Sequence, residues 1–168
     1  MMFQLQNGAN MKHLVAVLSM TLSVALSLHA QKEAIVTNHA RGTFDVKVIP
    51  QAADDPAGGP FSRLFIDKQF HGDLDGTSQG QMLGAGTAVE GSAAYVALEL
   101  VTGTLSRRRG SFILQHTGAM KKGAPTMMVT VVPDSGTDQL TGLAGKMTII
   151  IADGKHSYEF EYTLGGAP

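Results

Sequence analysis

The feature that most constrains the fold of this chain is a repeated alternation of apolar and polar residues over short segments. In residues 155–164, four ring-bearing side chains share one side of the alternation: His156, Tyr158, Phe160 and Tyr162. Because successive side chains of a β-strand point to opposite faces, this pattern predicts a strand with one buried face. Eight segments are predicted as strands on this ground: residues 42–50, 61–71, 77–86, 93–105, 111–120, 126–132, 146–153 and 155–164.

The connections between these segments are mostly of hairpin length. Asp153-Gly154 is a favoured two-residue hairpin turn, and the longest late connection, residues 133–145, has room for one short helical turn. A helix is the rival interpretation of residues 93–105, which are rich in Ala and Leu, but their β-branched and glycine-bearing flanks favour a strand. The sequence therefore predicts an all-β, eight-stranded antiparallel closed barrel, since closure removes exposed sheet edges.

A predicted targeting segment precedes the predicted barrel. Residues 11–30 place Lys12 before an uncharged run and end at Ala30, which is typical of a secretory signal peptide helix. Cleavage is expected after Ala30, with residues 23–25 as the fallback, and Met11 is a second candidate for the start. We expect a periplasmic or secreted protein without a stable membrane anchor after cleavage. The expected domains are the signal peptide at 1–30, a loose arm at 31–40 and one barrel at 41–168.

Composition limits the available chemistry. The chain has no cysteine, which excludes a disulfide, a thiol nucleophile and a lipid-bearing cysteine anchor. Its formal net charge is −1, and removal of residues 1–30 takes away only Lys12, so the remainder is also slightly acidic. No basic field is present to attract nucleic acid, and we expect no nucleic-acid partner.

Several runs resemble a bacterial family of domains of unknown function. They are IDKQFHGDLDGTSQG at 66–80, YVALELVTGTL, GSFILQHTGAM, VTVVPDSGTDQLTGLAG and DGKHSYEFEYTL, in family order over nearly all of residues 41–164. Known structures of that family resemble the barrel of allene oxide cyclase, so the resemblance implies an allene-oxide-cyclase-like barrel with a calycin-like outline. Allene oxide cyclases are plant enzymes that cyclise an apolar epoxide, and none of their functional residues maps onto this chain by motif. Fold alone does not imply function.

The candidate site is a polar cluster inside the barrel. In residues 61–71, one face of the strand carries Asp67, Gln69 and His71, and the other carries Leu64, Ile66, Lys68 and Phe70. If the polar face points inward, it joins further groups to form a ligand site with these candidate residues: Asp67, Gln69, His71, Tyr95, Glu99, His116 and Tyr158, with Gln115 as the alternative to His116. Within it His71, Glu99 and Tyr95 are the catalytic candidates, because a histidine near a carboxylate suits acid–base chemistry. In the alternative, Leu64, Ile66 and Phe70 face inward and His71 caps a strand end.

Other chemistries are poorly supported. No tight His-x-x-x-His motif occurs, so we expect no metal, and no cofactor is expected either. Ser111 and Ser135 lack the nucleophile elbow of serine hydrolases. The basic turn at 107–109 is typical of a solvated loop.

Three functions remain open. The first is binding of a small, mostly apolar molecule inside the barrel, and the second is an isomerase or cyclase acting on a small lipophilic substrate. The third is a structural or interaction domain of undetermined oligomeric state. A polar cluster that points inward with room beside it favours the first two functions.

Overall fold

The computed structural model describes residues 36–52 and 59–165. The chain divides into two units, Met1–Glu33 and Ala34–Pro168, and the barrel belongs to the second. The predicted signal peptide lies outside the described residues.

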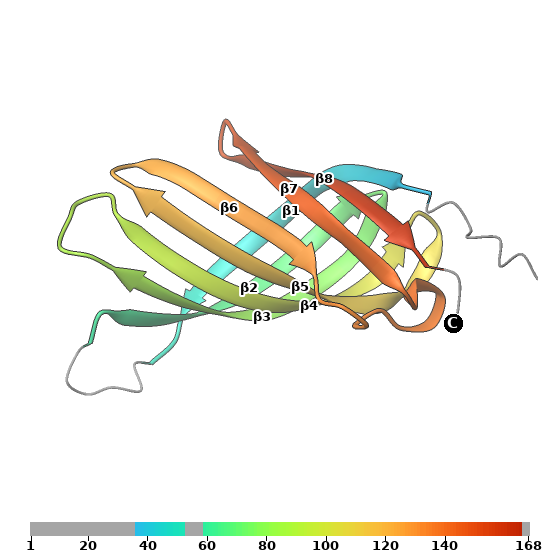
Figure 1. Cartoon of the computed structure of the whole chain (residues 1–168), viewed down its shortest axis with the longest axis horizontal. Helices are drawn as coiled ribbons and strands as arrows, with labels where there is room; N and C mark the ends of the chain where they lie inside the picture. Colours follow the sequence, from blue (N-terminus) through green and yellow to red (C-terminus); the bar gives the residue numbers. More distant parts are fainter. Residues whose placement is uncertain (1–35, 53–58, 166–168) are drawn as a thin grey trace, which may run out of the picture. The chain divides into compact units, whose positions relative to one another are not determined.

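Eight antiparallel strands form a closed barrel in which every strand pairs with its neighbours in the sequence, and the last with the first (Figure 1). The strands are β1 (Asn38–Pro50), β2 (Phe61–Gly72), β3 (Leu74–Gly86), β4 (Ala93–Leu105), β5 (Arg108–Lys121), β6 (Ala124–Val131), β7 (Leu143–Ala152) and β8 (Lys155–Leu164). The predicted barrel and its strand count are confirmed.

Five strands begin two to four residues before their predicted starts, namely β1, β3, β5, β6 and β7, and the first two show why. β1 begins at Asn38, inside the expected loose arm, because residues 38–44 pair with β8. β3 begins at Leu74 rather than at Thr77, since the turn is made tightly at Gly72, with a φ of 107°, and Leu74 is fully buried. The short helical turn expected in residues 133–145 is present as the 3-10 helix η1 (Asp138–Leu140).

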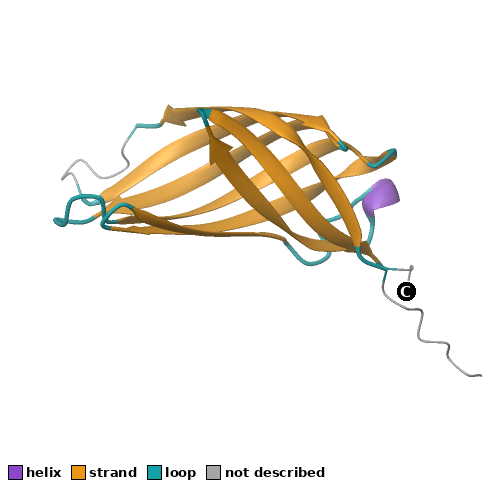
Figure 2. Cartoon of the chain, turned by 90° about the horizontal axis from the view of Figure 1, so that it is seen from above, coloured by secondary structure: helices purple, strands orange, loops and turns teal. Residues whose placement is uncertain are grey.

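One end of the barrel is closed by packed side chains. This closed end contains the β2–β3 and β4–β5 turns, and Figure 2 shows η1 beside it. Leu140 of η1 is buried, and Gln139 accepts a 2.8 Å hydrogen bond from the backbone N–H of Arg109. Large buried side chains fill this part of the lumen: Phe70, Leu74, Leu105, Phe112, Tyr158 and Phe160.

Tyr158 connects β8 to the β2–β3 turn at this end. Its hydroxyl oxygen accepts a 2.8 Å hydrogen bond from the backbone N–H of Leu74 and lies 3.3 Å from the carbonyl oxygens of His71 and Leu74. A buried tyrosine needs such partners for its polar group. Burial is the main cause that raises the pKa of Tyr158, so the hydroxyl stays protonated at neutral pH.

The other end, which carries the β3–β4, β5–β6 and β7–β8 turns, is less tightly closed. β6 and β7 pair at only one position, Thr130 with Lys146, whereas β5 and β6 pair over the whole of β6. The β5–β6 and β7–β8 hairpins diverge from that point (Figure 1). We call this end the open end and the diverging strands the β6–β7 seam.

Candidate functional site

Four polar side chains meet in the middle of the barrel. Oε1 of Glu99 lies 2.8 Å from Nζ of Lys68 and 3.0 Å from Nε2 of His116, and Oε2 of Glu99 accepts a 3.1 Å hydrogen bond from Ser78. All four residues are buried. We refer to Lys68, Ser78, Glu99 and His116 as the buried network.

The strand register brings these groups together. Lys68 of β2 pairs directly with Ser78 of β3, while Glu99 of β4 lies opposite Gly80 of β3. A Cβ at Gly80 would lie 2.6 Å from the Cβ of Glu99, so only glycine leaves the space through which Glu99 passes. Glu99 thereby reaches across β3 to the charge on β2.

Electrostatics keep Glu99 ionised. Burial raises the pKa of this carboxyl, but the hydrogen bond from His116 and the positive charges of Lys68 and His116 outweigh burial, so the net pKa is lowered. The rings of Phe44 and Phe70 lie 4.9 and 5.7 Å from the Lys68 nitrogen and add cation–π contacts. Each fully buried side-chain polar atom of the described residues has a hydrogen-bond partner.

Tyr95 lies next to the buried network on the side of the open end. It is half-buried and faces Gly118 of β5, and a Cβ at Gly118 would collide with the Tyr95 ring. Burial, and then the negative charge of Glu99, raise the pKa of Tyr95, so its hydroxyl remains a donor. No hydrogen bond joins this hydroxyl to any of the described residues.

A cavity of about 470 Å³ occupies the open end above Tyr95 and Gly118. Six strands, β2 to β7, contribute to its lining, and inward positions of six strands meet only across the lumen. The larger apolar side chains of the lining are Leu64, Met82, Met120, Met127 and Ile151, and small residues such as Gly84, Gly86 and Ala93 leave the space between them. We call this space the open-end cavity.

The predicted inward polar face of β2 is wrong. Ile66, Lys68 and Phe70 are buried, whereas Gln69 and His71 are exposed and Asp67 is only half-buried. Burying the apolar side chains of Ile66 and Phe70 stabilises the barrel more than burying the opposite, polar face of β2 would. The charge of Lys68, which this orientation places inside the barrel, is neutralised by Glu99. The alternative orientation, with His71 at a strand end, is confirmed.

The candidate residues are therefore divided between three places. Tyr95, Glu99 and His116 come together inside the barrel, Gln115 points outward, and Tyr158 lies in the closed end. His71 is half-exposed and lies 3.4 Å from Asp45 on the outer face, away from Glu99. The catalytic combination of His71 with Glu99 is thus not brought together.

Sequence reasoning missed Lys68 and Ser78. A signal was present, because Lys68 and Glu99 each interrupt an inward face made otherwise of apolar or small residues. A charge that shares a face with buried residues requires a partner of opposite sign, and these two supply each other.

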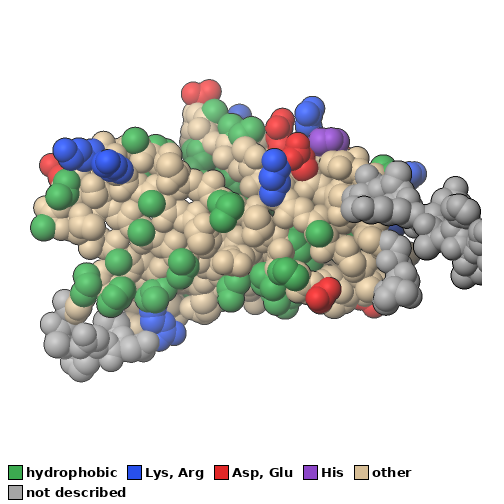
Figure 3. Space-filling view, in the orientation of Figure 1, with side chains coloured by type: hydrophobic (Ala, Val, Ile, Leu, Met, Phe, Trp, Pro, Cys, Tyr) green, Lys and Arg blue, Asp and Glu red, His purple; other side chains and the backbone are tan. Residues whose placement is uncertain are grey.

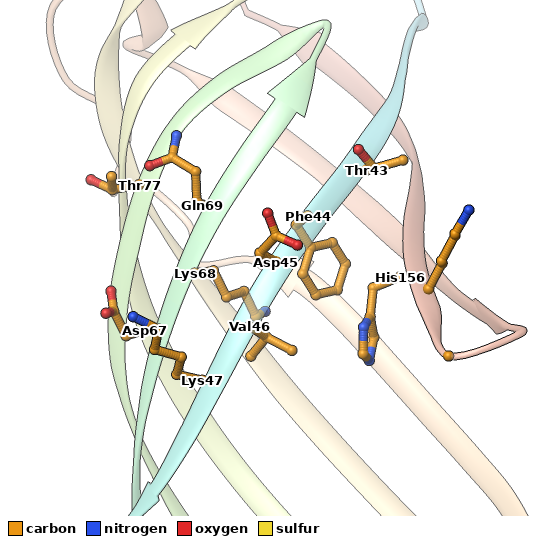
Figure 4. Close-up of a pocket in the computed structure, with 12 residues that line it drawn as sticks. Thr43, Phe44, Asp45, Val46, Lys47, Asp67, Lys68, Gln69, Thr77 and His156 are labelled. Carbon is orange, nitrogen blue, oxygen red and sulfur yellow. The ribbon is translucent and has the colours of Figure 1, made fainter.

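Asp67 and Gln69 line a second, more polar cavity of about 790 Å³ beside the β7–β8 turn (Figure 4). Asp67, Gln69 and Thr77 project to one side of β1 in that view, and Phe44 and His156 lie on the other. The Phe44 and His156 rings are 5.1 Å apart. Lys68 also lines this cavity, which therefore approaches the buried network from the side of β1.

The outer face of β3 and β4 is unexpectedly apolar. Val96, Leu98 and Leu100 are 53%, 54% and 51% exposed, and Leu83 of β3 pairs with Val96. Apolar side chains gather along this side of the barrel in the space-filling view (Figure 3). The inward face of β4 carries instead Tyr95, Ala97, Glu99 and Val101.

Residues 36–52 and 59–165 contain neither a metal-binding cluster nor a membrane-spanning helix. They contain no group of three or more His, Asp or Glu side chains placed to hold a metal ion. No helix in these ranges has the length and apolar character needed to cross a membrane.

Comparison with known proteins gives a family and a solved structure. A family model described as a protein of unknown function (DUF3224) matches residues 40–162. The chain is similar to the crystal structure of a protein with unknown function from the DUF3224 family of Shewanella oneidensis MR-1, at 46% identity and a TM-score of 0.74. The similarity covers 79% of this chain and 100% of that one. No curated protein matches.

Proposed function

The chain belongs to the DUF3224 family, whose function is unknown, and on that premise we propose that it binds a small, mostly apolar molecule in the open end of its barrel. The observation that carries the proposal is the open-end cavity of about 470 Å³. Cavities of this size with apolar walls and few polar groups are typical of small-molecule sites. Because a water molecule occupies about 30 Å³ of the liquid, the cavity has room for on the order of 15 groups of that size.

The lining suits a ligand of irregular shape. Met82, Met120 and Met127 are flexible and polarisable side chains that adapt to different apolar surfaces. Tyr95 supplies a hydrogen-bond donor at the floor. These features support a ligand that is apolar over most of its length and carries an acceptor at one end.

The β6–β7 seam supports a lateral entrance. Continuing the register beyond Thr130 and Lys146 would place Met127 opposite Ile149, but the two strands do not pair there. Met127, Met128 and Ile151 are 43%, 60% and 62% exposed beside the seam. We propose that the ligand enters between these side chains.

Titration with the neutral dye Nile red tests the proposal. Gly86 has ordinary backbone angles, and the position that a Cβ would occupy there is surrounded by open space, so Gly86→Trp fills the cavity rim without strain. We expect saturable fluorescence with the wild-type protein and at least a tenfold loss of affinity in Gly86→Trp. The matched control is Ala144→Trp, at an exposed position of β7 near the closed end, which should bind as wild type. Equal binding by all three proteins, or none by the wild type, would refute the proposal.

An isomerase or cyclase acting on a small lipophilic substrate is the second candidate function. The specific observation in its favour is that the buried network lies directly beyond the cavity floor, with Glu99 close enough to raise the pKa of Tyr95. Ionisable groups placed beside an apolar cavity are a frequent arrangement in active sites.

We further infer that the protein is exported. The ground is the sequence of residues 11–30, which lie outside the described residues. Detection of a mature N-terminus at residue 31 in the periplasm or medium would support export, and an intact chain in the cytoplasm would refute it. An allene-oxide-cyclase-like assignment of the barrel also stays a proposal, supported by its eight consecutive antiparallel strands.

A further inference from the structure

The outer face of β3 to β6 is uncharged over most of its length. No charged side chain points outward from residues 77–85, 94–104, 111–119 and 126–130, and we call this surface the charge-free face. The outward positions of the other four strands include these charged residues: Arg41, Asp45, Lys47, Arg63, Asp67, Lys146, Lys155, Glu159 and Glu161. A solvated sheet face is normally polar, and depletion of charged residues is typical of the centre of a protein–protein interface.

The centre of the charge-free face is apolar and hollowed. Val96, Leu98 and Leu100 of β4 are each about half-exposed there. A hollow of about 780 Å³ has Leu83, Val96 and Leu98 in its lining. A contiguous patch of exposed apolar side chains with a polar rim marks a surface that another molecule covers.

The strand register makes this face complementary to a second copy of itself. β4 lies between β3 and β5, and Leu98 pairs with Gln81 on one side and with Gln115 on the other. A two-fold axis along β4 would place Gln81 of each copy over Gln115 of the other copy. Each amide has donors and an acceptor, so the two side chains can form hydrogen bonds with each other.

The same axis pairs opposite charges at the closed end. Thr104 of β4 pairs with Asp75 on one side and with Arg109 on the other. Both charged side chains are exposed, and neither forms an ion pair within the described residues. Rotation about β4 would bring Asp75 of each copy towards Arg109 of the other, so the rim gains two attractive pairs.

We propose that two copies of the chain form a dimer through their charge-free faces, with β4 of one copy packed on β4 of the other. Val96, Leu98 and Leu100 form the centre of the interface, and the two amides flank Leu98. Asp75 and Arg109 select the orientation in which the closed ends lie together. The interface lies outside the barrel, so the proposal is independent of ligand binding in the open-end cavity.

The charge-free face is large enough for a stable dimer. Four strands about 4.8 Å apart and about 30 Å long cover roughly 570 Å² of each copy, or roughly 1,100 Å² in total. A biological interface is expected to bury about 1,000 Å² or more. A lipid surface fits less well, because the amides of Gln81 and Gln115 would find no hydrogen-bond partner in hydrocarbon.

Sedimentation equilibrium of the wild-type chain and of Leu98→Glu tests the proposal. Leu98 points outward and is more than half-exposed, so the substitution leaves the barrel intact. It brings two carboxylates together at the two-fold axis, and we expect dimer affinity to fall at least about 100-fold. The matched control is Ile150→Glu, at an exposed outward position of β7, which should dimerise as wild type.

A charge exchange tests the two-fold arrangement. Asp75→Arg places a second cation beside Arg109 of the other copy, and it should weaken the dimer about tenfold. Adding Arg109→Asp restores opposite signs and should return the affinity close to that of wild type. A double variant as weak as Asp75→Arg alone would overturn the packing of β4 on β4.

Three further outcomes would overturn the proposal. The first is a wild-type chain that stays monomeric at the highest soluble concentration, and the second is a dimer that persists equally in Leu98→Glu and Ile150→Glu. The third is a monomer that binds phosphatidylcholine vesicles and loses this binding in Leu98→Glu, which would assign the face to a lipid surface.

Discussion

The ammonium nitrogen of Lys68 lies 2.8 Å from Oε1 of Glu99 inside the barrel, where the two side chains are 5% and 0% exposed. Their strands are not neighbours, because β3 lies between β2 and β4. A buried ion pair is weak support for stability, since desolvation of both groups offsets their attraction. We therefore interpret the pair as part of a functional site.

Removing one charge of this pair should be far more harmful than removing both. Glu99→Gln leaves the Lys68 ammonium buried without a counter-charge, and breaking a buried pair in this way costs about 3–5 kcal/mol. Replacing both groups by apolar residues, in Lys68→Met/Glu99→Leu, should cost less than Glu99→Gln alone. Urea unfolding at neutral pH measures the three free energies, and a double variant less stable than Glu99→Gln would contradict this prediction.

Acid should weaken the wild-type barrel partly through Glu99. The pKa of Glu99 is lowered in the folded protein, so its contribution is complete above the unfolded value of about 4.3 and is lost as the pH falls through the folded pKa. The unfolded state binds the proton more readily in that range. The free energy of unfolding, measured from about pH 6 to about pH 3, should fall more steeply for wild type than for Lys68→Met/Glu99→Leu. Parallel curves would show that Glu99 has no such role.

The closed end should depend on the Tyr158 hydroxyl. Tyr158→Phe leaves the backbone N–H of Leu74 without its 2.8 Å partner, and an unsatisfied buried donor costs about 1–3 kcal/mol. Tyr162→Phe is the matched control, because Tyr162 is also buried but its hydroxyl bonds to none of the described residues. Equal destabilisation of the two variants in urea would argue against this assignment.

The architecture could be predicted from the sequence because its signals are local. Alternation in residues 155–164 and the Asp153-Gly154 turn fix two strands and their hairpin without distant information. Residues 93–105 are ambiguous in propensity, and their pairing with β3 and β5 makes them a strand.

The site was harder to predict, because which face of β2 points inward depends on interactions with residues far away in the sequence. Both faces of β2 carry polar residues, and the choice between Lys68 and His71 as the inward group depends on Glu99, which is 31 residues beyond Lys68. The more apolar face of β4 points outward, contrary to the usual rule, so hydrophobicity alone misleads there. Glu99 and Tyr95 could nevertheless be identified as members of one site, because the alternating pattern of residues 93–105 places both on the same face of the strand.

The most direct measurement of the central claim is NMR of methionine methyl groups during titration with 2-decanone. Met82 and Met127 line the open-end cavity, whereas Met147 is buried in the core and Met128 points away from the lumen. We expect saturable shifts at the methyl groups of Met82 and Met127, with little change at Met147 and Met128. Shifts at Met128 alone, or no saturable shift at Met82 and Met127, would contradict ligand binding inside this barrel.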